Sequence, residues 1–187
     1  MVSTYTTELR LEQMATGEKS GTWGTIANLQ FANLEAAIAG TATVAFASDG
    51  NDTLTTASGT DDEARHMFLN LSGGSTLTAT RNMVVPTASK LYFVYNGTTG
   101  SQSVQIIGAT GTGTTVPNGS YMALYHDGTN VIDAASHMSS LTLATALAET
   151  SGGTGQSTLT AGDILYASGA NALAKLAKGS DDQVLTL

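Results

Sequence analysis

The chain has 187 residues, of which 41% are hydrophobic and 6% aromatic, so it has room for one domain of ordinary size with extensions and a mainly aliphatic core. Only 12% of the residues are charged, and the formal net charge of −8, with few and scattered Lys and Arg residues, argues against nucleic-acid binding. The absence of cysteine excludes disulfides, and no apolar run approaches the roughly 18 residues needed to span a bilayer, so we expect no membrane insertion.

The first twenty residues predict one short strand and a turn. Residues 7–12 alternate, with Leu9 and Leu11 on one face and charged side chains on the other, as in a half-buried strand. Residues 16–21 are rich in turn formers and are expected to reverse the chain. The N-terminus has no apolar signal region, which favours synthesis in a cytoplasm without export by a signal peptide.

Residues 22–39 predict an α-helix. Thr22 or Thr25 is expected to cap its start, and Gly40 stands where a left-handed C-cap residue is expected. Spacings of three and four place five apolar residues on one stripe: Trp23, Ala27, Phe31, Leu34 and Ile38. The simpler interpretation is that this stripe packs on its own domain. The alternative is that it anchors the chain to a partner, because Trp and Phe are typical interface anchors.

From residue 41 to residue 135 the hydrophobic period switches to two, which is typical of strands. The candidate strands are Ala42–Ala47, Arg65–Leu71, Asn82–Pro86, Lys90–Asn96, Ser103–Ile107, Ser120–His126 and Asn130–Ala134. Turn residues separate them at 49–52, 72–74, 96–97, 117–119 and 127–128, and Asp127-Gly128 predicts a type I′ hairpin. The predicted fold class is therefore all-β: an antiparallel β-sandwich or barrel-like head with one N-terminal α-helix and an extended C-terminal segment.

The C-terminal segment 151–187 carries two small apolar islands in a background of Ala, Gly, Ser and Thr. Such a segment can be ordered only if other chains or other copies cover its apolar residues. The residues expected to make these contacts are Ile164, Leu165, Tyr166, Val184 and Leu185. The predicted organisation is 1–40 for attachment, 41–135 for the head, and 136–187 for a linker and the start of a shaft.

Two glycine-rich stretches resemble nucleotide-binding loops but lack their key residues. Residues 104–113 look like a strand entering a dinucleotide loop, but Val116 replaces the third small residue and 117–119 forms a turn where a helix is needed, so a β-hairpin loop is expected. Residues 152–157 look like a phosphate loop, but Gln156 replaces the essential lysine and Thr150 the first glycine.

Neither a metal site nor a catalytic constellation emerges from the sequence. Residues 61–63 and 49–52 are acidic and could supply oxygen ligands to Ca²⁺, although solvated loop carboxylates are the simpler interpretation. The three histidines are isolated, and His66 and His126 are expected to face solvent or cap a sheet edge. The sequence therefore predicts no enzyme, no cofactor and no bound metal.

Several short motifs carry a resemblance to a known class of proteins. These are Ser3–Glu12, Thr16–Gly24, Arg81–Pro86, Val116–Gly119, Tyr125–Val131 and the glycine-rich sequence from Gly152 to Leu185. In their order they resemble bacteriophage tail-fibre-type virion proteins, whose N-terminal part attaches to the tail. The resemblance covers most of the chain. It implies a structural, usually trimeric protein without catalytic residues.

The resemblance also implies partners and a location. The expected partners are other copies of the chain in a homotrimer, a tail, baseplate or adaptor protein, and a host surface receptor reached through a distal region beyond Leu187. The expected location is the virion tail after synthesis in the host cytoplasm. The residues expected to attach the chain to the tail are Leu9, Leu11, Trp23, Phe31 and Leu34.

Three alternatives stay open. The first is a tail adaptor without receptor contact. The second is the N-terminal part of a polysaccharide-degrading tailspike, which needs aromatic platforms or paired carboxylates on one surface. The third is a bacterial surface adhesin, which the low charge and the Thr and Gly content allow and which a signal peptide would support.

Overall fold

The computed structural model describes residues 2–135, 147–148, 151, 153–156, 158–170 and 172–179. The chain divides into two compact units, Met1–Ser136 and His137–Leu187, which are described separately below. Among the described residues there is one α-helix, and it is neither long nor apolar enough to cross a membrane.

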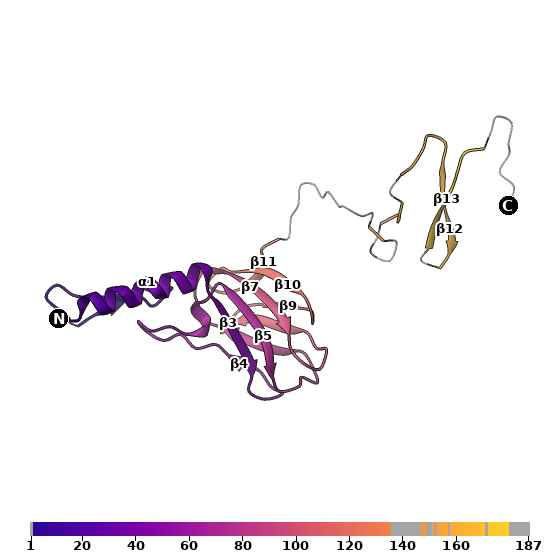
Figure 1. The fold of residues 1–187 in the computed structure, drawn as a ribbon. Helices are drawn as coiled ribbons and strands as arrows, with labels where there is room; N and C mark the ends of the chain where they lie inside the picture. The colour runs from indigo at the N-terminus through magenta and orange to yellow at the C-terminus, as the bar shows by residue number, and fades with distance from the viewer. Residues whose placement is uncertain are drawn as a thin grey trace. The chain divides into compact units, whose positions relative to one another are not determined.

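The first unit begins with a small arm and the helix. Strands β1 (Thr4–Tyr5) and β2 (Glu12–Gln13) pair antiparallel, and helix α1 (Trp23–Ala39) follows. Gly40 alone separates α1 from strand β3 (Thr41–Phe46), so the helix leads straight into the main sheet. Figure 1 shows α1 running outward from the strands, with the N-terminus near its outer end.

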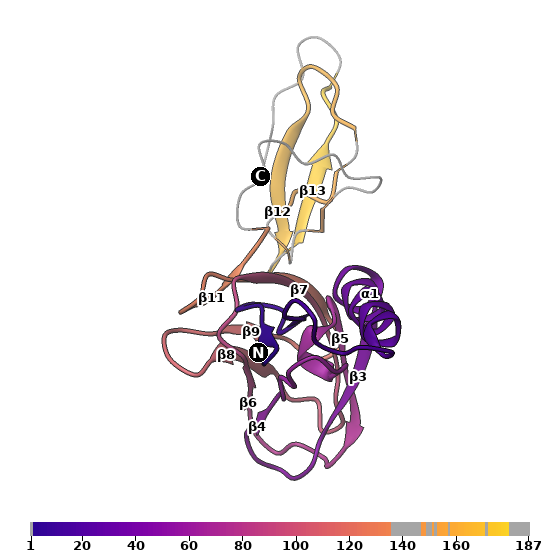
Figure 2. The same ribbon diagram turned by 90° about the vertical axis from the view of Figure 1, so that its left-hand side faces the viewer.

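The remaining strands of the first unit form two sheets that enclose a common core. The larger has the order β11-β10-β7-β5-β3 and the smaller the order β4-β6-β8-β9. Their bounds are β4 Asp52–Thr53, β5 Phe68–Gly74, β6 Arg81–Val85, β7 Lys90–Gly97, β8 Val104–Gly108, β9 Thr114–Val116, β10 Tyr121–His126 and β11 Val131–Asp133. Figure 2 shows α1 end-on, beside β3 and β5.

The core lies between the inward faces of these sheets. The larger sheet contributes Leu69, Leu71, Tyr92, Val94 and Leu124, and the smaller sheet contributes Met83, Val85, Val104, Ile106 and Val116. All ten are essentially inaccessible to solvent, as expected where alternate residues of two facing sheets interdigitate.

The predicted all-β, antiparallel fold class is wrong, because both sheets mix parallel and antiparallel pairs and a helix of 17 residues is part of the fold. Strands β3, β5 and β7 run parallel, as do β4, β6 and β8. From β3 to β8 the chain alternates between the two sheets, so each circuit of the core returns it to the first sheet in the same direction. The antiparallel pairs of the two sheets are β8–β9 and β10–β11, whose strands are consecutive, and β7–β10, whose strands are not.

The element-level predictions succeed in part. All seven predicted strands overlap observed ones, the helix is confirmed at Trp23–Ala39, and the expected hairpin after β8 is confirmed. The strand expected over 7–12 is wrong, because residues 7–9 form the turn between β1 and β2. The turns expected at 72–74 and 96–97 are instead the ends of strands β5 and β7.

The expected caps and hairpin turn also differ in detail. Thr22 occupies the N-cap position but makes no capping bond, and its hydroxyl donates to the Lys19 carbonyl oxygen at 3.2 Å. Gly40 is extended, with φ −79° and ψ 152°, and not left-handed. A hairpin does follow β10, but Asp127 pairs with Asn130, and only Gly128 of the intervening residues has positive φ, as a type II′ turn requires.

The described part of the second unit contains one hairpin. Strands β12 (Ile164–Gly169) and β13 (Ala172–Leu176) pair antiparallel with an irregularity between Ala167 and Gly169. At its base, one carboxylate oxygen of Asp163 accepts from the Thr160 backbone N–H at 2.8 Å and lies 3.4 Å from the Lys175 Nζ. These contacts lower the pKa of Asp163, chiefly through the bond from Thr160.

Candidate attachment surface

Helix α1 exposes its most apolar stripe to solvent. Trp23, Phe31 and Ile38 are 64%, 66% and 67% exposed, and the two residues between them on the stripe, Ala27 and Leu34, are partly buried. A surface helix normally turns such a stripe toward its own core. The simpler interpretation of the sequence, in which the stripe packs on its own domain, is therefore not what the structure shows. We call Trp23, Ala27, Phe31, Leu34 and Ile38 the apolar stripe.

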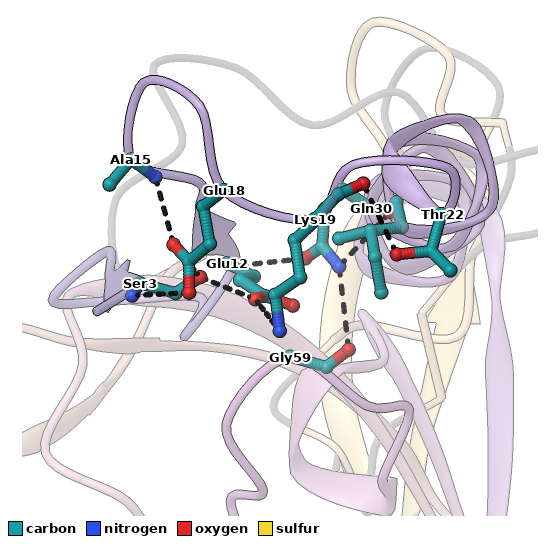
Figure 3. Close-up of polar contacts among 9 residues, drawn as sticks. Ser3, Glu12, Ala15, Glu18, Lys19, Thr22, Gln30 and Gly59 are labelled. Carbon is teal, nitrogen blue, oxygen red and sulfur yellow. Dashed lines mark hydrogen bonds and ion pairs between the residues drawn. The ribbon is translucent and has the colours of Figure 1, made fainter. Parts of the chain in front are cut away.

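The neighbouring side of α1 is buried and held by polar side chains. Asn33 is fully buried, and its Nδ2 donates to the carbonyl oxygen of Gly59 at 3.3 Å. The Nε2 of Gln30 donates to the same oxygen at 3.4 Å, while its Oε1 accepts from the backbone N–H of Glu12 at 2.8 Å. Figure 3 shows Gln30 between the arm and Gly59. The helix is thus fixed to the arm and to the loop around Gly59 with its apolar stripe left outside.

A second cluster of polar contacts holds the arm together beside the helix (Figure 3). The hydroxyl oxygen of Ser3 lies 2.6 and 2.9 Å from the carboxylates of Glu12 and Glu18, which share its single proton, and the backbone N–H of Ala15 donates to Glu18 at 3.1 Å. Lys19 pairs with Glu12 at 3.2 Å. The bond from Ser3 is the main cause that lowers the pKa of Glu18, and the bond to Glu12 raises that of Lys19. Both charges therefore persist at neutral pH.

A buried arginine joins the arm to the head. Arg65 lies in the short 3₁₀ helix Glu63–Arg65 and is 3% exposed. Its guanidinium donates to the carbonyl oxygens of Leu9 in the arm, of Ala57 at 2.9 Å and of Thr60 at 2.6 Å. Because Gly59 lies between the last two acceptors, Arg65 also braces the loop on which α1 rests.

Lys90 holds the segment that carries Arg65. Its Nζ donates to the carbonyl oxygens of Ala64, Arg65 and His66 at 3.1, 2.6 and 3.0 Å, and it lies 4.5 Å from the ring centroid of Tyr92. Burial lowers the pKa of Lys90 to about 8, and the positive charge of Arg65 acts in the same direction. At neutral pH the ammonium is still mostly charged and can satisfy all three carbonyls.

We expect the free energy of unfolding to rise as the pH is raised from about 7.5 to about 9.5. In this window unfolded chains keep the lysine proton, with a pKa near 10.4, whereas folded Lys90 loses it. The stabilisation that comes from deprotonation of Lys90 is therefore complete above the pKa of unfolded lysine, and it is lost as the pH falls through about 8. Its slope should stay below the one-proton limit of about 1.4 kcal/mol per pH unit, because the side chain is partly exposed.

Urea unfolding of the wild type and of Lys90→Met across that window checks this expectation. The variant should be less stable at neutral pH and should lose the rise with pH. Above about pH 10 the opposite trend is expected in both proteins, because burial raises the pKa of Tyr92 while unfolded tyrosine ionises. Parallel pH profiles for the two proteins would show that Lys90 is not the group responsible.

The residues predicted for attachment separate into two places. Trp23, Phe31 and Leu34 share the stripe on α1. Leu9 and Leu11 are partly buried in the arm, and Leu9 lines a small cavity against the head with Ala64, Pro86 and Tyr92 among others. The leucines of the arm therefore contribute to internal packing and not to the exposed stripe.

The residues predicted for shaft contacts lie in the second unit. Ile164 and Tyr166 are about half exposed on one face of β12, and Leu165, on the other face, is partly buried. Val184 and Leu185 lie outside the described residues.

The acidic loops are used for internal bonds. Glu63 accepts from the backbone N–H and the hydroxyl of Thr55, both at 3.0 Å. Asp49 accepts from Thr78 and from the Arg81 Nε at 2.9 Å, and these bonds, led by that from Arg81, lower its pKa. Within the described ranges, His, Asp and Glu form no group of three that could hold a metal ion.

The prediction that His126 faces solvent or caps a sheet edge is wrong. This histidine is 1% exposed, and its Nδ1 lies 3.0 Å from the Ala88 carbonyl oxygen, so it neither faces solvent nor caps an edge. The reason is the register of β10, in which Leu124 and His126 share the inward face.

The sequence interpretation missed a second exposed apolar surface, on the outer face of the larger sheet. Phe93, Tyr121 and Tyr125 lie there in the middle strands. A signal was present in the runs 91–95 and 121–125, which are apolar at nearly every position and not at alternate ones, a pattern typical of strands covered on both faces. No family model, curated protein or solved structure matches the chain.

Proposed function

We propose that the chain is a structural virion protein of the bacteriophage tail-fibre type. In this proposal it acts mechanically and not as an enzyme, and the apolar stripe of α1 binds a tail, baseplate or adaptor protein. The observation that carries the proposal is the exposure of Trp23, Phe31 and Ile38 on a helix fixed by polar bonds on its neighbouring side. The order of the short motifs in the sequence, which resembles that of tail-fibre-type proteins, is the reason for proposing a phage particle.

The stripe is large enough to anchor a partner. At roughly 200 Å² for a complete aromatic residue, Trp23 and Phe31 together present about 260 Å² to solvent. Burial of that area at about 25 cal/mol per Å² would stabilise a complex by roughly 6 kcal/mol before the costs of association. Large, partly rigid side chains of this kind dominate interface energies.

The polar bonds beside α1 fix the position of the apolar stripe. Bonds from Gln30, Asn33 and Arg65 converge on the loop 57–60, so the helix cannot rotate to bury its own stripe without leaving these donors and acceptors unpaired. A preorganised surface loses little conformational entropy on binding. This favours a permanent anchor.

The second unit supports a role in which its strands are covered by other chains. An isolated two-stranded hairpin is at best marginally stable, and β12–β13 leaves Ile164, Tyr166 and Leu176 between 39% and 49% exposed. In the proposal these residues contact other copies in a shaft, and a distal region carries the contact with a host receptor.

Electron microscopy of purified phage particles labelled with antibodies against this chain tests the proposal. Gold label is expected at the tail, on particles from a lysate in which the chain is produced. Label on bacterial envelopes with none on particles would overturn the proposal in favour of a surface adhesin.

A further inference from the structure

The outer face of the larger sheet is apolar and rich in aromatic residues. Strands β5, β7, β10 and β11 place eight apolar residues on it: Phe68, Leu91, Phe93, Tyr95, Tyr121, Ala123, Tyr125 and Ile132. Five of them are aromatic, out of eleven Phe, Trp and Tyr residues in the whole chain. We call these eight residues the aromatic face.

The strand register sets these side chains in contact with one another. Tyr95 and Tyr121 are directly opposite across β7 and β10, and their rings stack with centroids 4.4 Å apart. Phe68, beside Phe93 in the parallel pair β5–β7, lies 6.2 Å from the ring of Tyr121. Aromatic contacts of this kind stiffen the surface, because each ring limits the rotamers of its neighbour.

The face is too large and too exposed to be incidental. Tyr121, Ile132, Phe93 and Tyr125 are 69%, 45%, 40% and 39% exposed. The three aromatic residues among them present roughly 300 Å², at about 200 Å² for each complete residue, and this alone reaches the size of the largest apolar patch on an ordinary monomer. With the rest of the sheet face it covers much of the roughly 800 Å² that each partner contributes to a standard interface.

The charge distribution favours another copy of this chain as the partner of the aromatic face. The chain carries a net charge of −8, so two copies repel each other overall. In the fully described range 2–135, the outward positions of the five strands hold no charged residue, and those of β3 are Thr41, Thr43 and Ala45. A neutral face can meet the same face of another copy without burying an unpaired charge.

A saccharide fits this face less well. The shallow hollow on it is lined by Phe68, Phe93, Val94, Tyr121, Met122 and Ala123. These side chains supply one hydroxyl group, whereas sugar recognition needs several polar groups beside an aromatic ring. A flat apolar face with tyrosine hydroxyls is instead typical of the centre of a protein–protein interface.

We infer that the aromatic face is the surface through which the first unit associates with other copies of this chain. The inference does not depend on attachment to a phage tail, because it concerns contacts between identical chains alone. It places a self-association surface in the first unit. This surface shares no residue with the hairpin of the second unit or with the apolar stripe.

Tyr121→Lys in the full chain tests the inference by sedimentation and light scattering over a range of concentrations. The wild type is expected to form a dimer or a trimer, and the variant to need at least about tenfold higher concentration to do so. The variant also reduces the magnitude of the net charge from −8 to −7, so weaker association cannot result from greater overall repulsion between copies. Tyr121 is exposed, so the variant should fold, and circular dichroism and thermal unfolding verify this.

Thr115→Lys is the matched control. Thr115 is exposed in strand β9 of the smaller sheet, and the substitution makes the same change to a positively charged residue. It should associate as the wild type does. A monomeric wild type at all concentrations would overturn the inference and leave the face for a different partner. Unchanged association of a folded Tyr121→Lys variant would also overturn it.

Discussion

Replacement of both Trp23 and Phe31 by serine is expected to remove the chain from assembled particles while the free protein stays folded. Both side chains are about two-thirds exposed, so their loss should change the free energy of unfolding by no more than about 0.5 kcal/mol each. In a complex they would be the buried anchors, and loss of two such residues should weaken binding by at least about a hundredfold. Quantitative mass spectrometry of purified particles measures the retained chain.

A control on the same helix separates this effect from damage to α1. Asn28 and Ala32 are exposed on the side away from the apolar stripe, and Asn28→Ser with Ala32→Ser should leave the chain in the particles at the wild-type amount. Equal retention of the stripe variant and the control would mean that the stripe is not the attachment surface.

Arg65→Met is expected to have the largest effect on stability. The substitution removes the donor to the carbonyl oxygens of Leu9, Ala57 and Thr60 in a partly buried site, and a group left buried and unpaired costs about 1–3 kcal/mol. We therefore expect a loss of about 3 kcal/mol or more in the free energy of unfolding, read from the midpoint of urea unfolding. Hydrogen exchange should also show faster exchange in the arm, because Arg65 is its link to the head.

Arg10→Met is the comparison for this substitution. Arg10 lies in the arm, donates one exposed hydrogen bond to the hydroxyl of Ser58 at 3.0 Å, and lies 5.9 Å from the ring centroid of Tyr5. The same change of charge and shape should cost less than about 1 kcal/mol there. If Arg65→Met lowered the free energy of unfolding no more than Arg10→Met does, the contacts that hold the arm and the helix would not depend on the buried guanidinium.

The sequence predicted strands well and their arrangement badly. Alternation in 103–107 locates β8, because Val104 and Ile106 turn into the core while their neighbours do not. Alternation is the same for parallel and antiparallel strands. The turn residues at 72–74 therefore predicted where a strand ends but not that the chain crosses there from β5 to the other sheet.

The candidate sites were predictable to different degrees. The spacing of Trp23, Phe31 and Ile38 predicted one helical stripe, but its direction depends on what the neighbouring side of the helix can bind. That side carries Asn33 and Gln30, whose partner Gly59 is distant in sequence, so no local pattern could show it. The same holds for Arg65, whose acceptor on Leu9 is 56 residues away.

Hydroxyl-radical footprinting of Trp23, in the free chain and in purified particles, tests most directly whether the apolar stripe is an attachment surface. Trp23 is the only tryptophan of the chain, so its oxidation can be assigned to one peptide. Phe46, which is fully buried, is the internal reference in both samples. The proposed attachment predicts rapid oxidation of Trp23 in the free chain and protection by several-fold in the particle. Equal oxidation of Trp23 in both samples would contradict it.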